Sequence, residues 1–410
     1  MQAPGAEPRS AGSTADRARL GAVIEETLAY ARERDYRGWD YGDGMSSRLL
    51  DALPVESTLV NLAVQETIKR FPRNVRPLLL VEQRRNYKGT ALFAMANQNA
   101  HRLHERSPAL LDAPEGGYIA ETDALLEWLV ENRCGGYSGF CGAHQHELQK
   151  LDGTVGRPDQ PDLVSTSYGV KALLRGADRS AGYATVARSA VPFLFEDLDY
   201  RAVDDGAVVN YHLNHPPEEF TVNAGALGAR LLVDLHDHTG EDRLATAAGS
   251  ILDHVAGLQT DRGGWYYRDP PSSSHLSMDN HHNGFVIEAF QRHAAVVDAD
   301  RYADTLADAL AFYREELFEP DGAPNFDEES AYPRDVHAAA QGILVFTYAG
   351  EYGLARRIAE WTIDELYLGD GRFLFRKHRF HTKRHVLMRW CVAWMAYALS
   401  EFLREAPDAW

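Results

Sequence analysis

The residues richest in chemistry in this 410-residue sequence are two aspartates, each followed closely by a histidine. Asp279 stands three positions before His282, and Asp335 stands two positions before His337. Two carboxylates that face one cavity can donate and accept protons on a sugar, including across a glycosidic bond. Histidine titrates near neutral pH, so the two histidines could carry protons as well. These four residues are therefore the predicted catalytic groups.

Aromatic and arginine residues near these segments are suited to hold a sugar. Tryptophan and tyrosine offer flat apolar faces with polar edges, which match the C–H face of a pyranose ring. Arginine can hold a carboxylate or a phosphate through two parallel hydrogen bonds. The substrate-binding candidates of these types are Trp39, Trp265, Tyr266, Tyr267, Arg334, Arg389 and Trp390. Together they favour an acidic sugar as the substrate.

A simpler interpretation of the two aspartates stays open. Asp279 and Asp335 could be helix N-caps, because an aspartate side chain accepts a hydrogen bond from a free backbone N–H at a helix start. Capping alone does not account for the histidine, tyrosine, arginine and tryptophan residues beside them.

A metal site is the other alternative, and several histidines raise it. His144 and His146 are close in sequence, but no segment has the His-Glu-x-x-His spacing of a zinc helix. His281 and His282 are adjacent, so we expect them to point to different sides of a helix and not to share one ion. The sequence also lacks a Gly-x-x-x-x-Gly-Lys phosphate loop. No metal and no cofactor are therefore predicted.

A repeating pattern of turn and helix indicates what positions these residues. Glycines at tight-turn sequences recur as Gly206, Gly264, Gly322 and Gly371, at intervals of 58, 58 and 49 residues, and aromatic residues follow each one. Between the turns, apolar residues recur at the i, i+3, i+4, i+7 spacing of a helix. The predicted helix pairs are 165–177 with 181–196, 221–239 with 242–259, 282–296 with 301–317, and 336–349 with 353–366.

Two helices in each repeat of about 55 residues indicate stacked helical hairpins. Neither end carries the polar capping repeat that an open solenoid needs, so we expect an all-α, (α/α)6-type toroid with short β-like loop segments at one mouth. The last helix, 388–404, should pack against the first, 16–34. Inner helices should begin near residues 165, 221, 281, 336 and 388, and residues 39–44 have a similar composition. The candidate residues would then share one mouth of the ring, which is a usual place for a ligand.

Composition narrows the partners and the location. The net charge of -18 argues against a nucleic-acid partner. Only six of the 42 basic residues are lysine, which fits a halophilic cytoplasm or an arginine-rich GC-biased genome. The three cysteines lack zinc-ligand spacing and suit a reducing cytoplasm. No stretch approaches the roughly 20 apolar residues of a membrane span. Residues 1–14 are predicted to be a disordered lead and residues 15–410 a single toroid domain.

Four segments can be compared with known motifs. Tyr36–Ser47 resembles Gly-Tyr-Asp-Pro-Tyr-Asp-Gly-Leu-Asn-Ser, and Asp279–Val286 resembles Asp-Asn-Phe-His-Thr-Gly-Phe-Val. Tyr332–Gln341 resembles Tyr-Pro-Ile-Asp-Val-His-Ser-Ala-Ala-Gln, and Met388–Trp394 resembles Met-Arg-Trp-Gly-Gln-Ala-Trp. In this order the motifs resemble the AglQ-like family, toroid proteins of polysaccharide and lipopolysaccharide gene clusters. Its archaeal members take part in S-layer protein N-glycosylation.

The resemblance covers residues 30–402 and implies a role in surface-glycan assembly. It implies functional roles at the matching positions Asp40, Asp43, Asp279, His282, Asp335, His337, Arg389 and Trp390. Asp43 thereby joins the catalytic candidates, and Asp40 joins the substrate-binding ones. The sequence departs from the family pattern at Gly42, where the family has Tyr, and at His281, where it has Phe.

Three classes of function remain in view. The preferred one is an epimerase or isomerase of a hexuronic-acid-type sugar, since the histidines and tyrosines could remove and return a proton. A glycoside hydrolase would use the paired aspartates, and a non-catalytic glycan-binding or scaffold protein would use the aromatic residues. The expected partners are a sugar or lipid-linked glycan and, peripherally, the membrane glycosylation machinery. The expected location is the cytoplasm, including the inner face of the membrane; the sequence leaves the oligomeric state open.

Overall fold

The chain is described here from a computed structural model. The structure describes residues 10–52, 57–144, 146–149, 155–213, 215–216 and 218–407, without the side chains of residues 10–14 and 148. Most of the predicted lead over residues 1–14 lies outside these ranges, and helix α1 begins at Ser10. The division into a lead and one domain therefore stays a prediction.

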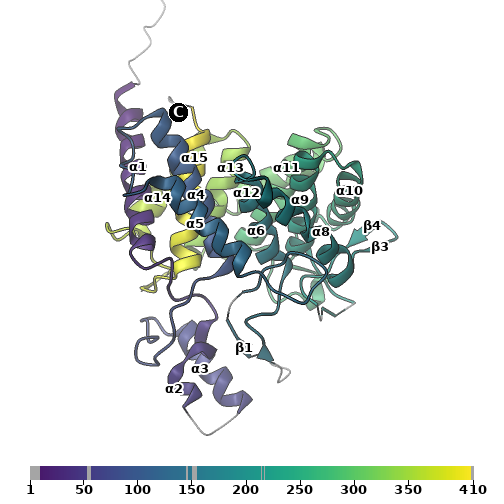
Figure 1. Cartoon of the computed structure of the whole chain (residues 1–410), viewed down its shortest axis with the longest axis horizontal. Coiled ribbons are helices and arrows are strands. Elements are labelled where there is room, and N and C mark those ends of the chain that lie inside the picture. Colours follow the sequence, from purple (N-terminus) through teal and green to yellow (C-terminus); the bar gives the residue numbers. More distant parts are fainter. Residues whose placement is uncertain are drawn as a thin grey trace, which may run out of the picture.

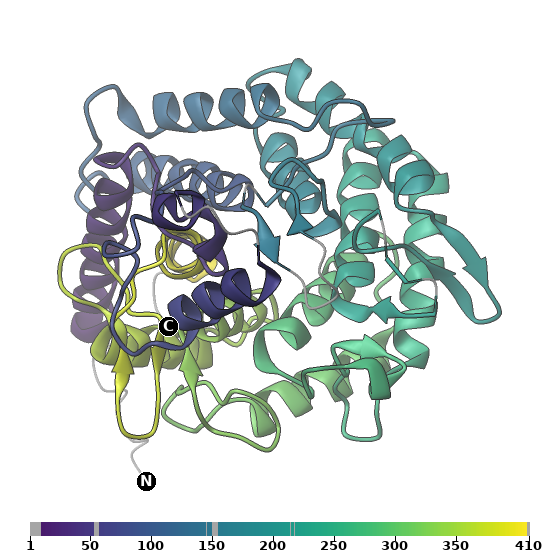
Figure 2. The ribbon, with the colours of Figure 1, turned by 90° about the horizontal axis from the view of Figure 1, so that it is seen from below.

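Two concentric rings of helices form the body of the protein (Figure 2). The inner ring consists of α4 (Tyr87–Arg106), α6 (Leu163–Arg175), α9 (Val222–Thr239), α11 (Asn280–Val296), α13 (Val336–Tyr348) and α15 (Trp394–Glu405) with its π-helical lead-in η4 (Met388–Ala393). The outer ring consists of α1 (Ser10–Arg32), α5 (Gly117–Glu131), α7 (Ala181–Arg188), α10 (Asp242–Gly257), α12 (Ala303–Glu316) and α14 (Tyr352–Leu366). Short segments α8 (Ala190–Pro192) and η2 (Phe193–Asp197) extend α7. The predicted all-α, (α/α)6 toroid is confirmed.

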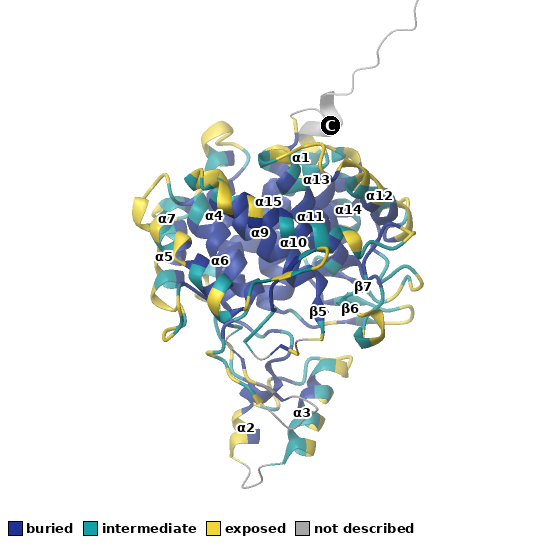
Figure 3. Ribbon diagram, turned by 90° about the vertical axis from the view of Figure 1, so that its right-hand side faces the viewer, coloured by how far each residue is buried: buried dark blue, intermediate teal, exposed yellow. Residues whose placement is uncertain are grey.

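Burial separates the two rings. Every residue from Val336 to Thr347 of α13 is buried, and so is every residue from Tyr87 to Ala100 of α4. Outer helices such as α14 bury one stripe and expose the other face, as Figure 3 shows in yellow at the periphery. Small residues let the inner helices approach closely: a Cβ added to Gly284 of α11 would lie 2.2 Å from Gln341 Cγ of α13. The hydrophobic core is thus continuous around the ring.

The ring closes between the two ends of the chain. Helix α15 packs against both α13 and α4, which completes the inner circle, and α1 packs against α15 from outside. Arg17 of α1 donates hydrogen bonds to the carbonyl oxygens of Leu403 (3.2 Å) and Pro407 (3.3 Å). The predicted contact between the first and last helices is therefore confirmed.

Short strands gather at the end of the toroid where the inner helices begin. Strand β5 (Phe220–Thr221) runs into α9 and pairs antiparallel with β6 (Arg268–Asp269). Strand β7 (Arg334–Asp335) runs into α13 and pairs with β8 (Arg376–Lys377), which pairs with β9 (Thr382–Lys383). Two further hairpins are β1 (Leu148–Gln149) with β2 (Val155–Gly156) and β3 (Arg201–Val203) with β4 (Gly206–Val208). Ladders β5–β6 and β7–β9 hold the loops that enter the inner helices.

A small unit projects from the same end (Figure 1). It contains α2 (Arg48–Asp51) and α3 (Thr58–Arg70), and it follows the 3-10 turn η1 (Asp43–Ser46). Residues 39–44 therefore form a loop and this turn, and do not begin an inner helix as their composition suggested. The inner helix at this place begins at Tyr87, where the Asn86 side chain accepts a hydrogen bond from Gly89 N–H. Within the described residues, no helix combines the length and the apolar character that crossing a bilayer requires.

Candidate active site

A cavity of about 370 Å³ lies where the inner helices begin, and all six of them contribute to its wall. Their lining residues are Lys88 of α4, Val164 and Ser165 of α6, Asn223 of α9, His281, His282 and Phe285 of α11, His337 of α13, and Arg389 and Trp390 of η4. The loops add Tyr41, His144, Asp162, Tyr211, Tyr267, His275, Leu276 and Phe326, and strand β8 adds Arg376. The toroid therefore collects titratable and aromatic groups from distant parts of the sequence at one point.

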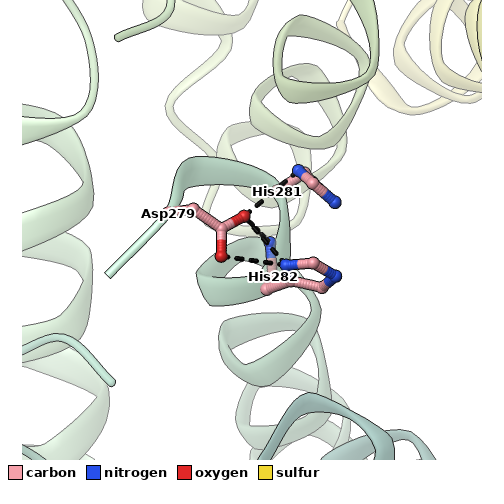
Figure 4. Close-up of side chains that lie close together, drawn as sticks. All are labelled: Asp279, His281 and His282. Atoms are coloured by element: carbon pink, nitrogen blue, oxygen red, sulfur yellow. Dashed lines mark hydrogen bonds and ion pairs between the residues drawn. The ribbon is translucent and has the colours of Figure 1, made fainter. Parts of the chain in front are cut away.

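Asp279 binds two histidines at the start of α11 (Figure 4). Its side chain caps the helix and accepts from His282 Nδ1 at 2.9 Å through either oxygen, and its Oδ2 lies 3.2 Å from His281 Nδ1. Burial would raise the pKa of Asp279, but the charges of the two imidazoles and the hydrogen bonds from His282 hold it below its ordinary value. Asp279 is thus a carboxylate that orients both rings.

The prediction that His281 and His282 point apart is wrong. Both lie in the first turn of α11, and the carboxylate of the capping residue Asp279 contacts both rings. Their ring centroids are 3.9 Å apart. One ligand atom from each of Asp279, His281 and His282 lies within 4.8 Å of the other two, so the three could hold a metal ion.

His337 enters the cavity from the neighbouring helix α13. Its ring stacks on His281 with a centroid distance of 4.7 Å and on Trp394 at 4.4 Å. Neither ring nitrogen has a hydrogen-bond partner among the described residues. Burial, and then the neighbouring His281, hold the pKa of His337 well below its ordinary value. His282 and His337, both predicted as catalytic, thus line one cavity from two helices.

Three cations face this cavity. Burial and the nearby charge of Arg389 lower the pKa of Lys88 to about 7, and its ammonium lies 5.4 Å from the ring centroid of Trp394. Arg389 Nε donates to Asp40 Oδ2 at 2.7 Å, and Arg376 Nε donates to Asp335 Oδ2 at 2.5 Å. The two aspartates therefore hold the arginines from behind, in a site suited to an anionic ligand.

Asp335 caps α13 and lies outside the cavity wall. Its Oδ1 accepts from the backbone N–H of His337 at 2.8 Å and from Trp390 Nε1 at 2.9 Å, while Oδ2 binds Arg376. Both oxygens are therefore engaged with three residues, all of which line the cavity. This geometry favours a positioning role for Asp335 over direct contact with a substrate.

Asp43 is buried away from the cavity as well. Its carboxylate accepts from Arg76 Nε at 2.8 and 2.9 Å and from the backbone N–H of Asp40 at 3.0 Å. The Arg76 guanidinium also donates to the carbonyl oxygen of Asp40 at 3.0 Å. Asp43 and Arg76 thereby fix the loop that carries Asp40, and Asp40 in turn fixes Arg389. The predicted substrate-binding residue Asp40 acts in this geometry through Arg389.

The aromatic candidates separate into two groups. Trp390 and Tyr267 line the cavity, and the Tyr267 ring lies 4.5 Å from that of His282. Trp265 is a core residue: it stacks on Phe290 at 5.7 Å and donates from Nε1 to the Val255 carbonyl at 2.7 Å. The structure therefore does not bring Trp265 to the predicted sugar-binding surface.

Three other binding candidates also lie away from the cavity wall. Trp39 donates from Nε1 to the Val81 carbonyl at 3.1 Å. Arg334 lies 3.7 Å from Glu319 and its guanidinium stands over Tyr332. Tyr266 is half-buried and packs against the core. None of Trp39, Arg334 and Tyr266 is among the described residues that line the cavity.

Sequence reasoning missed several cavity residues that lie between the motifs. Lys88 has a recognisable signal, because it is the single charged residue in the first three turns of α4. Asp162 is another: it caps α6, with Oδ1 accepting from Ser165 N–H at 2.7 Å and Oδ2 from the Ser165 hydroxyl at 2.7 Å. Arg376 reaches the cavity only because β8 pairs with β7, which local sequence does not reveal.

Two histidines, His144 on the cavity wall and the buried His146 outside it, predict that the fold is sensitive to acid. Burial lowers the pKa of His146 to about 4 and that of His144 to about 3. An imidazole with a depressed folded-state pKa stabilises the fold above its unfolded pKa near 6.5, and this contribution is lost as the pH falls toward 4. The folded protein keeps His146 neutral at pH 5.5, whereas the unfolded chain protonates it. The free energy of unfolding is therefore expected to be about 1.4 kcal/mol lower at pH 5.5 than at pH 7.5.

Chemical denaturation of the wild type and of His146→Gln at these two pH values measures this contribution. The variant should lose about 1.4 kcal/mol less than the wild type between pH 7.5 and pH 5.5. An equal loss in both proteins would contradict a buried neutral His146.

Comparison with known proteins identifies the fold of the chain but does not identify its family. No protein-family model matches the chain, and no curated protein matches its sequence. Solved structures do match. Cellobiose 2-epimerase from Spirochaeta thermophila is 14% identical, with a TM-score of 0.57, over 78% of this chain and 86% of that one. The GH76 α-mannanase from Bacteroides thetaiotaomicron is 12% identical, with a TM-score of 0.58, over the same shares.

A third structure matches over a greater length. The unsaturated glucuronyl hydrolase from Bacillus sp. GL1, responsible for the degradation of glycosaminoglycan, is 12% identical, with a TM-score of 0.57 over 97% of each chain. At these identities the three structures show that the chain has the (α/α)6 toroid fold.

Proposed function

We propose that the protein catalyses proton transfer at a carbon next to a sugar carbonyl, as an epimerase or isomerase of a hexuronic-acid-type sugar. The observation that carries this proposal is the placement of His282 and His337, from two neighbouring inner helices, on one cavity that three cations also face. Two bases and an anion-binding surface are what such a reaction needs.

The proposed reaction starts from the open-chain form of the sugar. One imidazole takes the proton from the carbon next to the carbonyl, and the C–H electron pair forms a C=C bond while the carbonyl pair moves onto oxygen. Lys88 and Arg389 stabilise the resulting negative oxygen. Return of a proton to the opposite face of the same carbon gives the epimer. Return to the former carbonyl carbon, with the hydroxyl proton moved to the former carbonyl oxygen, gives the isomer.

Hydrolysis by paired aspartates has less support. Asp279 reaches the cavity through its histidines, and both oxygens of Asp335 are engaged behind Trp390 and Arg376. Asp162 is the single carboxylic acid among the described residues of the cavity wall, and both of its oxygens bind Ser165. A glycosidase of the usual kind needs two free carboxyl groups across its substrate.

The sugar class and the pathway form part of the same proposal. Arg376, Arg389 and Lys88 provide the charge that would bind a hexuronate carboxylate. The toroid is shared with a cellobiose 2-epimerase and an unsaturated glucuronyl hydrolase, which supports a carbohydrate substrate. The resemblance to the AglQ-like family supports work on a free or lipid-linked sugar in surface-glycan assembly, on the cytoplasmic side of the membrane.

Proton NMR in D2O tests the reaction directly. The purified chain is incubated with hexuronic acids and with short glycans that contain them. We expect solvent deuterium to enter at the carbon next to the carbonyl, with no new reducing end. A new reducing end without deuterium entry would contradict the proposal and show that the protein is a glycoside hydrolase. Saturable binding with neither change would replace it by a glycan-binding function.

Lys88 is predicted to make substrate affinity depend on pH. Its pKa of about 7 means that the ammonium form is present below pH 7 and is lost as the pH rises through it. The KM for a hexuronate should therefore increase above pH 7, and Lys88→Met should raise it about 10-fold or more at pH 6 because a charge-assisted hydrogen bond is lost. The matching neutral hexose is the control, since its KM should change little. A parallel rise for both sugars would contradict a role for the Lys88 charge.

A further inference from the structure

We infer that Asp279, His281 and His282 form a binding site for a divalent first-row transition metal ion of the Zn²⁺ class. The site lies at the start of α11, on the wall of the cavity described above. The inference rests on the geometry of these three side chains and does not depend on the proposed function.

The three side chains already converge (Figure 4). Asp279 Oδ2 lies 3.2 Å from His281 Nδ1 and 2.9 Å from His282 Nδ1. Zinc bonds of about 2.0–2.1 Å at tetrahedral angles place ligand atoms about 3.3 Å apart. The carboxylate–imidazole separations are therefore within a few tenths of an ångström of those in an occupied site.

The chemical types of the donors select the class of ion. Two imidazole nitrogens with one carboxylate oxygen suit Zn²⁺, Co²⁺, Ni²⁺ or Fe²⁺, whereas Mg²⁺ and Ca²⁺ prefer ligand sets made of oxygen. Asp279 is buried at the start of α11, and its carboxylate is the one anionic donor of the triad for such an ion. Three protein ligands leave further positions for water or for a sugar oxygen.

A second, independent feature lies at the open side of this triad. His337 is buried, its ring stacks on His281 at 4.7 Å, and neither of its nitrogens has a hydrogen-bond partner among the described residues. An unpartnered buried imidazole is costly and points to a missing partner. His337 thus offers a further nitrogen donor beside His281.

His281 is the residue that makes the set complete. Without it, one carboxylate and one imidazole would remain, which is fewer than the three protein ligands of a catalytic zinc site. A bound ion would also take Nδ1 of His282. In the absence of metal, this nitrogen hydrogen bonds with Asp279 and so orients the ring. Occupation of the site would therefore compete with the proton transfer proposed for His282.

Zinc titration of the full chain after treatment with a chelator tests the site. Competition with a chromophoric chelator gives the affinity, and Co²⁺ in place of Zn²⁺ gives visible absorption bands that report a low-coordinate site with nitrogen ligands. We expect one equivalent to bind to the wild type. His281→Phe and Asp279→Asn should each weaken zinc binding by at least about 100-fold. Loss of a residue that only supports a ligand typically weakens binding by about 10–100-fold, and loss of the ligand itself should weaken it more.

His275→Gln is the matched control, because His275 lines the same cavity outside the triad. Its affinity for Zn²⁺ should stay within about 2-fold of the wild type, and circular dichroism should show that every variant keeps its helices. Absence of a stoichiometric equivalent, or equal weakening by His275→Gln and His281→Phe, would overturn the inference.

The D2O experiment on the chelator-treated chain separates this inference from the proposed function. Deuterium entry without zinc binding would leave the proposed function standing and remove the metal site. Zinc binding at the triad without any deuterium entry under either condition would keep the metal site and remove the proposed function.

Discussion

Replacing His282 by glutamine is expected to slow deuterium entry into a hexuronate by about 10²–10⁴-fold, the usual contribution of one acid–base group. The reason is specific to its setting. Asp279 holds His282 Nδ1 at 2.9 Å, which leaves Nε2 as the nitrogen free to accept a proton in the cavity. Glutamine keeps polarity and approximate length but cannot carry a proton.

His337→Gln should lower the rate by a similar factor, since the reaction needs one group to remove the proton and one to return it. The two residues act in the same reaction, so the double variant should be little slower than the slower single variant. NMR rates for the four proteins, each at saturating substrate, measure this pattern. Fully multiplicative losses would indicate independent steps and argue against a shared proton path.

His101→Gln provides the control for this series. His101 lies on the outside of α4, where it pairs with Glu105, and its side chain is about one third exposed (32%). Its removal should leave the rate of deuterium entry unchanged. Unaltered rates in His282→Gln and His337→Gln would exclude both residues from proton transfer and would move attention to the remaining lining residues.

Most of the helical frame could be predicted from the sequence because five of the six inner helices have a strong, long apolar period. The predicted starts at 165, 221, 281, 336 and 388 compare with observed starts at 163, 222, 280, 336 and 388. Deep burial on all sides leaves little freedom in where such helices begin, and polar caps mark their starts. The same logic located Asp279, His282 and His337 at one mouth.

Helix α4 was missed because its buried face contains polar residues that break the apolar pattern. Asn97 donates to the Phe93 carbonyl at 2.9 Å, and Asn99 donates to Glu401 at 2.8 Å. These side chains are satisfied by long-range or local partners that a sequence window cannot reveal. Lys88 went unnoticed with the helix that carries it.

The site was predicted less well than the frame because its details depend on tertiary contacts. Trp265 follows a glycine turn like a binding-loop residue, yet it stacks on Phe290 in the core. Asp335 has the spacing of a catalytic carboxylate, yet the pairing of β7 with β8 brings Arg376 onto it. Residue types and spacing identify which side chains are available, but neighbours from other repeats decide what each one contacts.

The second large prediction concerns Asp43. The family resemblance implies a catalytic role for this residue, whereas its contacts in the structure imply that it stabilises the fold. Asp43 and Arg76 are both almost fully buried and bind each other at 2.8 Å. Removing one partner of a buried ion pair leaves the other charge uncompensated, which typically costs about 3–5 kcal/mol. Asp43→Asn is therefore expected to lower the free energy of unfolding by about this amount, as measured by urea denaturation with far-UV circular dichroism.

The double variant Asp43→Asn/Arg76→Met separates the two roles. It removes both charges, so it should recover much of the stability lost in either single variant, since the free energy lost is mainly that of an unpaired buried charge. The rate of deuterium entry should follow stability. When it is measured without urea, at a temperature where each variant is folded, the double variant should keep measurable activity, because Asp43 lies off the cavity wall. A double variant that is stable yet as inactive as His282→Gln would return Asp43 to the catalytic residues. If instead stability and rate recover together, Asp43 holds the loop through which Asp40 positions Arg389.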